Sequence, residues 1–203
     1  MTLTKATPPR RRLTHAIAEL FPPQGQWSED EYLGVSDRSN RLIELSNGKL
    51  EVLDMPTDPH QYAVGRLHYF ILRFLMEHVL GEIRVAPLPV RLWPGKFREP
   101  DLMYLSTAHL DRITSEYWGV PDLVIEVHSP GSHHRDKRVK YHEYAQAGIA
   151  EYWMVDTDAK TIAVYRLHQE DYVLHRQYAQ SETLLSEQLP GFELNLVDVF
   201  AKA

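Results

Sequence analysis

Two carboxylates and one lysine in the middle of the chain have the residue types and the order that metal-assisted hydrolysis of a phosphate ester requires. Asp101 stands where a short apolar segment begins, Glu126 interrupts a second apolar segment near its end, and Lys140 follows in a predicted helix. Carboxylates at the ends of neighbouring strands can hold Mg²⁺, which prefers oxygen ligands and usually keeps several waters. A nearby lysine can activate the attacking water or stabilise the charge that develops on a phosphate.

Glu126 is the member of this set that is hardest to explain by structure alone. It follows Leu123-Val124-Ile125, whose β-branched residues favour a buried strand. An isolated buried charge is costly, so Glu126 must be paired, protonated or bound to a metal. The others have equally good structural interpretations. Asp101 can close a turn, and Asp136 with Lys140 has the i,i+4 order of a surface ion pair.

The segment around Glu126 predicts a strand–helix–strand unit. The strand at Leu123–Ile125 is followed by a helix from about Asp136 to Ala147 and by a second strand at 152–155. This spacing is typical of a crossover between two parallel neighbouring strands. Because ligands of such sheets bind beyond the carboxyl ends of the strands, we expect Glu126 to lie at a site.

The Asn47-Gly48 pair predicts a β-hairpin made of residues 42–46 and 49–53. A two-residue turn fixes the register, which places Glu44 directly opposite Glu51. The two carboxylates then either lie on a solvated face or have a metal ion, Lys or Arg beside them. We expect Glu51 to be the better site candidate, because it lies closer to the next helix, and Glu44 to be an accessory residue.

The remaining elements frame these candidates. The next helix begins at Asp58, with Pro59 in its first turn, and ends at Gly81. His60 in that first turn can reach a site at the end of the hairpin, although a lone helical histidine is more often structural. Further strands are predicted at Glu82–Ala86, Leu88–Trp93, Leu102–Leu105, Thr161–Leu167 and Tyr172–Tyr178.

The composition is that of an ordinary folded protein. The chain has 203 residues, 43% of them hydrophobic, and we expect an N-terminal extension at 1–39 and one domain at 40–203. The absence of cysteine excludes disulfides, thiolate metal sites and a cysteine nucleophile. No segment is apolar for long enough to span a membrane, and the basic residues 10–12 lack the apolar run of a signal peptide, so we expect a cytoplasmic protein.

Basic residues cluster in the sequence between Glu126 and Lys140. The net charge of −6 does not by itself indicate binding to nucleic acid, so the local distribution of charge decides. Arg135, Lys137 and Arg138 precede Lys140 at the predicted helix start. They are candidates for contacts with DNA phosphates, which require only positive charge and position. A solvated helix start explains them equally well.

Taken together, these motifs resemble the Uma-two family of restriction-endonuclease-like proteins, part of the PD-(D/E)XK nuclease superfamily. The resemblance runs from about Arg41 to Leu167 and is specific as a set, although each motif is weak alone. The motifs are the Glu44–Glu51 hairpin, Pro59-His60, Pro100-Asp101, Pro121-Asp122-Leu123-Val124-Ile125-Glu126-Val127, Ser129-Pro130, Asp136, Lys140, Tyr144, Gly148-Ile149 and Glu151-Tyr152-Trp153-Met154-Val155-Asp156.

The resemblance implies an α/β (α+β) fold: a restriction-endonuclease-like core with a mixed central β-sheet flanked by helices, an N-terminal extension and antiparallel β additions. It implies that Asp101 and Glu126 ligate Mg²⁺ or Mn²⁺, with Glu51 completing the shell. One position departs from the superfamily pattern, because His128 stands two residues after Glu126, where a catalytic lysine usually sits. The family pattern implies that Lys140 has taken over this role, with His128 as an accessory residue.

Three functions are consistent with these features. The leading hypothesis is a Mg²⁺-dependent endonuclease that hydrolyses DNA phosphodiester bonds. The alternative is a DNA-binding or interaction protein that keeps the nuclease fold with a degenerate site, which His128 and the acidic net charge favour. A third hypothesis is a metal-dependent hydrolase of small phosphate esters. Nucleases that resemble this family commonly act as dimers, so we also expect a homodimer.

Overall fold

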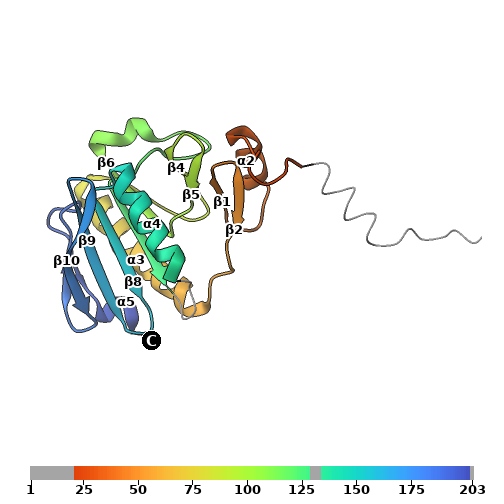
Figure 1. Ribbon diagram of the computed structural model, residues 1–203. Helices are drawn as coiled ribbons and strands as arrows, with labels where there is room; N and C mark the ends of the chain where they lie inside the picture. Colours follow the sequence, from red (N-terminus) through yellow and green to blue (C-terminus); the bar gives the residue numbers. More distant parts are fainter. Residues whose placement is uncertain (1–20, 129–133, 202–203) are drawn as a thin grey trace, which may run out of the picture.

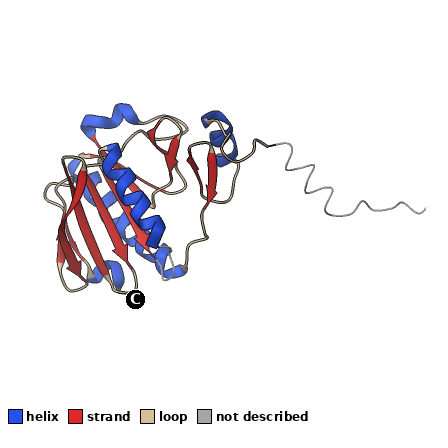
Figure 2. Cartoon of the chain, viewed as in Figure 1, coloured by secondary structure: helices blue, strands red, loops and turns tan. Residues whose placement is uncertain are grey.

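The computed structural model describes residues 21–128 and 134–201, the first four residues of the second range by their backbone alone. The strands form two larger sheets and one two-stranded sheet, and the helices pack against them (Figure 1, Figure 2). In chain order the elements are α2 (Glu29–Ser36), β1 (Ile43–Ser46), β2 (Lys49–Val52), α3 (Asp58–His78), β3 (Gly81–Val85), β4 (Val90–Trp93), β5 (Lys96–Arg98), β6 (Leu102–Ser106), the 3-10 helix η1 (Thr107–Arg112), β7 (Leu123–His128), α4 (His134–Ala147), β8 (Glu151–Asp156), β9 (Thr161–His168), β10 (Asp171–Ala179), β11 (Thr183–Leu185), β12 (Glu193–Asn195) and α5 (Val197–Phe200).

The central element is a six-stranded mixed sheet in the order β10-β9-β8-β7-β6-β3. Strands β7 and β8 are parallel neighbours, which confirms the predicted crossover through α4. The other neighbouring pairs in this sheet are antiparallel. The predicted mixed sheet flanked by helices is therefore confirmed.

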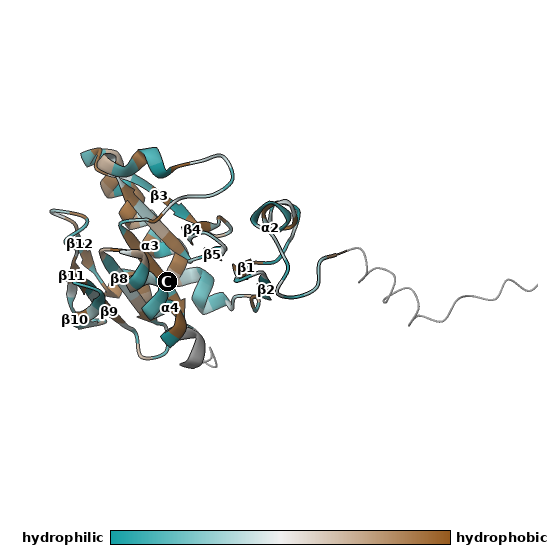
Figure 3. Cartoon of the chain, turned by 45° about the horizontal axis from the view of Figure 1, so that its top comes forward, coloured by the Kyte–Doolittle hydropathy of each residue, from teal (hydrophilic) through white to brown (hydrophobic). Residues whose placement is uncertain are grey.

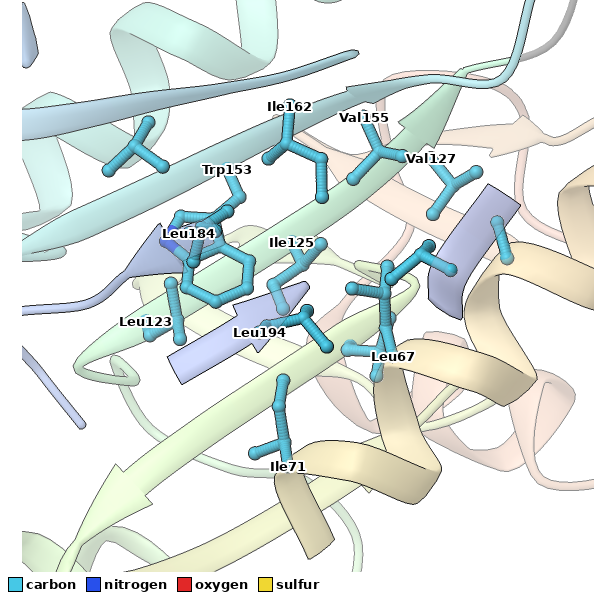
Figure 4. Packing of buried hydrophobic residues seen from close by; sticks show 14 of the residues in the cluster. Leu67, Ile71, Leu123, Ile125, Val127, Trp153, Val155, Ile162, Leu184 and Leu194 are labelled. Carbon is cyan, nitrogen blue, oxygen red and sulfur yellow. The ribbon is translucent and has the colours of Figure 1, made fainter. Parts of the chain in front are cut away.

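Helices cover both faces of this sheet, with α3 on one face and α4 on the other (Figure 1). The strands alternate between the two faces, as side chains of period two require. On β7, Leu123, Ile125 and Val127 pack toward α3, where Leu67 is fully buried (Figure 4). Val124 packs in the cluster that contains Tyr144 of α4.

This alternation explains why Glu126 can occupy a buried strand. It stands between Ile125 and Val127 and therefore points toward α4 rather than into the apolar layer under α3. The sheet strands are largely hydrophobic, whereas the part of α4 that the structure describes is largely hydrophilic (Figure 3). The face of β7 that carries Glu126 therefore meets a helix that can supply polar partners.

A second, four-stranded sheet in the order β2-β1-β5-β4 lies beside the first. The hairpin register is the one predicted, with Glu44 opposite Glu51, and Asn47 and Gly48 have φ values of 50° and 73°. Its small core includes Tyr32 of α2 and Phe97 of β5, whose ring centroids are 5.0 Å apart. Because β5 pairs with β1, β1 is an interior strand and β2 is an edge strand.

Two of the element boundaries that differ from the prediction have a clear physical reason. Helix α3 ends at His78, where Val79 adopts the left-handed φ of 49°, and Gly81 begins β3 instead of ending the helix. Gly81 is required there because an added Cβ would lie 2.0 Å from the carbonyl oxygen of Leu105. The strand expected at Leu88–Trp93 is shorter, Val90–Trp93, since the prolines on either side of Leu88 cannot donate ladder hydrogen bonds.

In the part of the chain that the structure describes, no helix is long and apolar enough to cross a membrane.

Candidate active site

Asp101 and Glu126 come from the neighbouring strands β6 and β7, which are interior strands of the six-stranded sheet. The two residues meet at the end of the sheet where β6 begins and β7 ends. Strands β6 and β7 are antiparallel, with Leu102 paired to Ile125. Continuing this register by one residue places Asp101, just before β6, opposite Glu126 in the second half of β7. The structure therefore brings together the two carboxylates on which the sequence hypothesis rests.

The carboxylate of Asp101 is held through one oxygen. Its Oδ2 accepts a hydrogen bond from the backbone amide of Val127 at 2.7 Å and lies 3.1 Å from Nε2 of His60. His60 is in the first turn of α3, so this helix as well as the sheet positions Asp101. Burial alone would lower the pKa of His60, but the hydrogen bond and charge of Asp101 outweigh burial, so the pKa of His60 is raised.

The carboxylate of Glu126 is also held through one oxygen. Its Oε1 accepts hydrogen bonds from Lys140 Nζ at 3.1 Å and from the Tyr144 hydroxyl at 2.6 Å. Both donors lie on α4 in the i,i+4 relation, and therefore on the same helix face. The predicted contact between Lys140 and the site is thus present. Tyr144 is part of the family motif, yet it was not predicted to contact Glu126.

The surroundings of Glu126 favour its protonated form. Burial has the largest influence, and the negative charges of Asp101 and Glu44 act in the same direction. Lys140 and the Tyr144 hydroxyl act in the opposite direction without full compensation, so the pKa of Glu126 is raised to about 7. A perturbed carboxyl beside a second acid is typical of functional sites, since a cation placed there relieves the repulsion between the two acids.

The hairpin contributes one buried glutamate, and it is Glu44. The side chain of Glu44 is fully buried, whereas that of Glu51 is 48% exposed. Both carboxylates accept hydrogen bonds from the buried guanidinium of Arg98, at 2.5 Å and 2.8 Å. An arginine beside the pair makes the opposed charges tolerable, which was the second of the two predicted arrangements. Glu44 Oε1 also lies 3.1 Å from Lys140 Nζ, whereas no such contact of Glu51 occurs among the described residues.

Arg98 and Glu143 extend this ion-pair network. Nε and Nη2 of Arg98 donate to the two carboxylate oxygens of Glu143 at 2.7 Å and 3.1 Å, a bidentate geometry. The Lys96 ammonium also pairs with Glu143. The network thus joins β5 of the small sheet to α4, the helix that carries Lys140. Neither Arg98 nor Glu143 was predicted at the site. The one available signal is that Lys96 and Arg98 alternate around the apolar Phe97.

The predicted phosphate-contacting residues lie at the start of α4. Arg138 is exposed, as such a contact requires. The side chains of Arg135 and Lys137 lie outside the described residues. The same holds for Asp136, the predicted ion-pair partner of Lys140.

A cleft of about 510 Å³ lies between the start of α3, the turn from β8 to β9 and the end of α5. His128 is half-buried at the end of β7, and its carbonyl oxygen accepts hydrogen bonds from the backbone amide and the hydroxyl of Thr157 at 3.4 Å and 3.0 Å. Thr157 lines the cleft together with Lys160 and Pro59, the residue before His60. Pro59 and Thr157 link this cleft to the site, but none of Asp101, Glu126 and Lys140 lines it.

Two carboxylate oxygens at the site accept no hydrogen bond from the described residues, Oδ1 of Asp101 and Oε2 of Glu126. This donor set fits Mg²⁺ or Mn²⁺, which are bound through one or two carboxylates while waters and substrate phosphates complete the coordination. It does not form a closed protein cage, because residues 21–128 and 138–201 contain no group of three His, Asp or Glu placed to enclose a metal ion.

Comparison with known proteins identifies the family and the fold. The family model described as "Uma2: Putative restriction endonuclease" matches residues 29–197. The chain belongs to the Uma2 family. The crystal structure of a protein described as "a putative nuclease belonging to DUF820", from Anabaena variabilis, superimposes on it with a TM-score of 0.67 at 18% sequence identity. The superposition covers 84% of this chain and 96% of the other, and at this identity it shows the shared fold alone. No curated protein matches the chain.

The Uma2 match confirms the resemblance and reaches further than the motifs did. It begins at Glu29, the first residue of α2, and extends beyond Leu167 to residue 197. The mixed sheet flanked by helices is the fold of the matching nuclease structure as well. This Uma2 protein therefore belongs to a family described as "Putative restriction endonuclease", and it has the predicted fold class.

Proposed function

We propose that this Uma2 protein is an endonuclease that hydrolyses DNA phosphodiester bonds with Mg²⁺ or Mn²⁺. The observation that carries the proposal is that Asp101, Glu126 and Lys140 lie together where β6 begins and β7 ends. The three side chains come from three different elements, and two of them leave a carboxylate oxygen to a cation. The family description supports DNA as the substrate class.

Asp101 and Glu126 would hold the metal ion through Oδ1 and Oε2. When bound, the ion supplies Lewis-acid activation of the phosphate and lowers the pKa of the attacking water. The hydrogen bonds to the opposite oxygens, from Val127 to Asp101 and from Lys140 to Glu126, fix the orientation of both carboxylates. Glu51 bonds to Arg98 instead, so the proposed ligand set consists of Asp101 and Glu126.

Lys140 would act on the attacking water and on the phosphate. Its ammonium group has only donors, so it can orient a water molecule or stabilise the negative charge of the transition state. The Tyr144 hydroxyl bonds to the same oxygen of Glu126 and keeps that carboxylate in place. His128 remains an accessory residue in this proposal, because Lys140 of α4 would supply the role of the lysine that usually stands at the position of His128.

Binding of DNA would depend on local positive charge, since the net charge is −6. Arg138 is exposed on α4 and Lys160 lines the neighbouring cleft. We include both as phosphate contacts, together with Arg135 and Lys137 at the start of the same helix. A homodimer in the cytoplasm belongs to the same proposal, and the mass of the protein in solution tests the dimer.

A DNA-binding protein without catalysis is the second candidate. Two observations favour it: His128 stands in place of the usual lysine, and the Lys140 ammonium is already held by two carboxylates. On this alternative, duplex DNA would still bind while no metal-dependent cleavage occurs. The two functions therefore differ in one measurable outcome.

Cleavage of supercoiled plasmid with Mg²⁺, with Mn²⁺ and with EDTA tests the proposed function. We expect nicked or linear DNA with either metal, none with EDTA, and none from Asp101→Asn. His175→Asn, which changes an exposed residue of β10, is the control and should cleave like the wild type. Undiminished cleavage by Asp101→Asn would contradict the proposal. Preferential hydrolysis of mononucleotides over duplex DNA would indicate a small-phosphate hydrolase.

A further inference from the structure

The Lys140 ammonium lies between two carboxylates from two different sheets. Its Nζ is 3.1 Å from Oε1 of Glu126 on β7 and 3.1 Å from Oε1 of Glu44 on β1. Glu126 belongs to the proposed metal site, whereas Glu44 belongs to the hairpin of the small sheet. We infer that Glu44 is a positioning residue that holds the Lys140 ammonium in place for the reaction. The inference rests on the proposed function.

The burial of Glu44 shows that its contacts are built into the fold. On β1, the neighbours Ile43 and Leu45 point into the core of the small sheet, so Glu44 points to the opposite face, toward α4. There its carboxylate is fully buried, and a buried carboxylate is tolerated only with good partners. The strand alternation that buries Ile43 and Leu45 therefore delivers this carboxylate to Lys140.

The carboxylate of Glu44 is fixed at three points. Oε1 accepts from the Glu99 backbone amide at 3.1 Å and faces Lys140, while Oε2 accepts from Arg98 at 2.5 Å. Burial alone would raise the pKa of Glu44, but Lys140 and Arg98 more than compensate, so its pKa is lowered and the group stays ionised. Glu44 is thus a buried carboxylate that Arg98, Lys140 and the Glu99 amide hold in place.

A fixed partner such as Glu44 limits the mobility of the Lys140 side chain. A lysine has a flexible four-carbon stem, and its head group is a mobile point charge. Glu126 alone is an unreliable partner, because the same carboxylate is proposed to bind the metal ion. Glu44 lies outside the proposed ligand set, so its hold on Lys140 does not change when metal binds. The hairpin, an element remote in sequence, thereby takes part in placing the lysine.

The same hairpin supplies a matched control. Glu51 is the cross-strand partner of Glu44 and bonds to the same guanidinium of Arg98, at 2.8 Å. Its side chain is 48% exposed, and it makes no contact with Lys140 among the described residues. Glu44→Gln and Glu51→Gln therefore remove the same charge from the same ion-pair network, but only the first removes a contact of the lysine.

The kinetic test compares these variants in plasmid cleavage at saturating metal. Glu44→Gln should lower kcat about 10–100-fold, the usual loss for a partner that orients an active-site group, with KM unchanged. Glu51→Gln should stay close to wild type. In a Lys140→Met background, Glu44→Gln should cause no further loss, because the residue acts through the lysine. Equal losses in Glu44→Gln and Glu51→Gln, or a full loss that persists in the Lys140→Met background, would overturn the inference.

A second measurement does not depend on cleavage. The rate at which acetic anhydride acetylates Lys140, measured by peptide mass spectrometry against the surface residue Lys160, reports how firmly the amine is held. It should rise several-fold in Glu44→Gln and stay at the wild-type value in Glu51→Gln. An unchanged rate in Glu44→Gln would refute the positioning role.

The two measurements separate this inference from the proposed function. If no protein cleaves DNA but only Glu44→Gln frees Lys140, the nuclease proposal fails and the positioning role stands. If circular dichroism shows that Glu44→Gln does not fold, Glu44→Asp is tested in its place. Aspartate retains the negative charge, but its side chain is one methylene shorter, so the carboxylate lies farther from the lysine. Glu44→Asp should then show an intermediate acetylation rate, and a wild-type rate in that variant would equally refute the role.

Discussion

Lys140 Nζ donates a hydrogen bond to Oε1 of Glu126 at 3.1 Å from a helix that crosses the sheet, not from the strand that carries the glutamate. The strand position two residues after Glu126 holds His128, and Lys140 comes from α4 instead. Their relative position depends on how α4 packs on β7 and on the small sheet. In this Uma2 protein, tertiary packing therefore places Lys140 beside Glu126.

His60 should support metal binding through Asp101. Because Nε2 of His60 lies 3.1 Å from Oδ2 of Asp101, it fixes the orientation of the carboxylate whose other oxygen is proposed to bind metal. His60→Ala should weaken Mn²⁺ binding about 10–100-fold, the usual effect of losing a group that orients a ligand. Titration calorimetry measures this, with the exposed His175→Ala as the control. Equal affinities in the two variants would mean that His60 is structural only.

Arg98 should be the strongest single electrostatic determinant of folding in the network. It is buried, and it bonds to Glu44, Glu51 and Glu143. Arg98→Met leaves the buried Glu44 without this partner and should lower the free energy of unfolding by about 3–5 kcal/mol. Arg84→Met breaks a half-exposed pair with Glu82 and should cost at most about 1 kcal/mol. Urea unfolding of both variants checks this, and similar losses would contradict it.

Glu99 predicts a pH dependence of stability. It is buried, its Oε2 has no hydrogen-bond partner among the described residues, and burial with the charge of Glu44 raises its pKa to about 7, against the hydrogen bond from Ser36. Because the folded pKa exceeds the unfolded one, this group stabilises the protein fully below the unfolded value of 4.5, and that stabilisation is lost as pH rises through about 7.

Glu99→Gln keeps the neutral shape and should remove this dependence. Urea unfolding at pH 5 and at pH 8 measures this. From pH 5 to pH 8, the free energy of unfolding of the wild type should fall by on the order of 3 kcal/mol relative to that of Glu99→Gln. Parallel stability profiles of the two proteins would show that Glu99 is ionised in the folded protein at both pH values.

Arg138 should contribute to DNA affinity without affecting the chemistry. It is exposed on α4 and is proposed to contact a phosphate. In a cleavage-deficient Glu126→Gln background, Arg138→Ala should weaken binding to all duplex sequences alike and reduce the slope of log affinity against log salt by about 1. Fluorescence anisotropy at several salt concentrations measures this, with Arg176→Ala of β10 as the control. An unchanged slope would remove Arg138 from the interface.

Local patterns in the sequence predicted most of the framework. The Asn47-Gly48 turn set the hairpin register, and the strand–helix–strand spacing set the parallel pair β7–β8, because both depend on contacts near in sequence. Helix α3 ends before the predicted Gly81 because that glycine is needed for close approach to β6, a contact between distant segments. Such long-range packing leaves little trace in a local pattern.

The choice between Glu44 and Glu51 shows the same limit at the site. The hairpin register places both on one face, but it does not say which strand a third strand will join. Strand β5 pairs with β1, so β1 becomes an interior strand and buries Glu44, whereas β2 stays at the edge and leaves Glu51 half-exposed. Arg98 and Glu143 were not predicted at the site because their contact depends on how β5 packs against α4.

The most direct measurement is calorimetric titration of Mg²⁺ and Mn²⁺ into the wild type and into Glu126→Gln, with plasmid cleavage assayed on the same samples and Glu51→Gln as the control. We expect wild type and Glu51→Gln to bind metal and nick DNA, and we expect Glu126→Gln to do neither while it remains folded. If the folded wild type binds no metal and cuts no DNA, or if Glu126→Gln cuts as fast as wild type, the proposed metal-dependent nuclease site is contradicted.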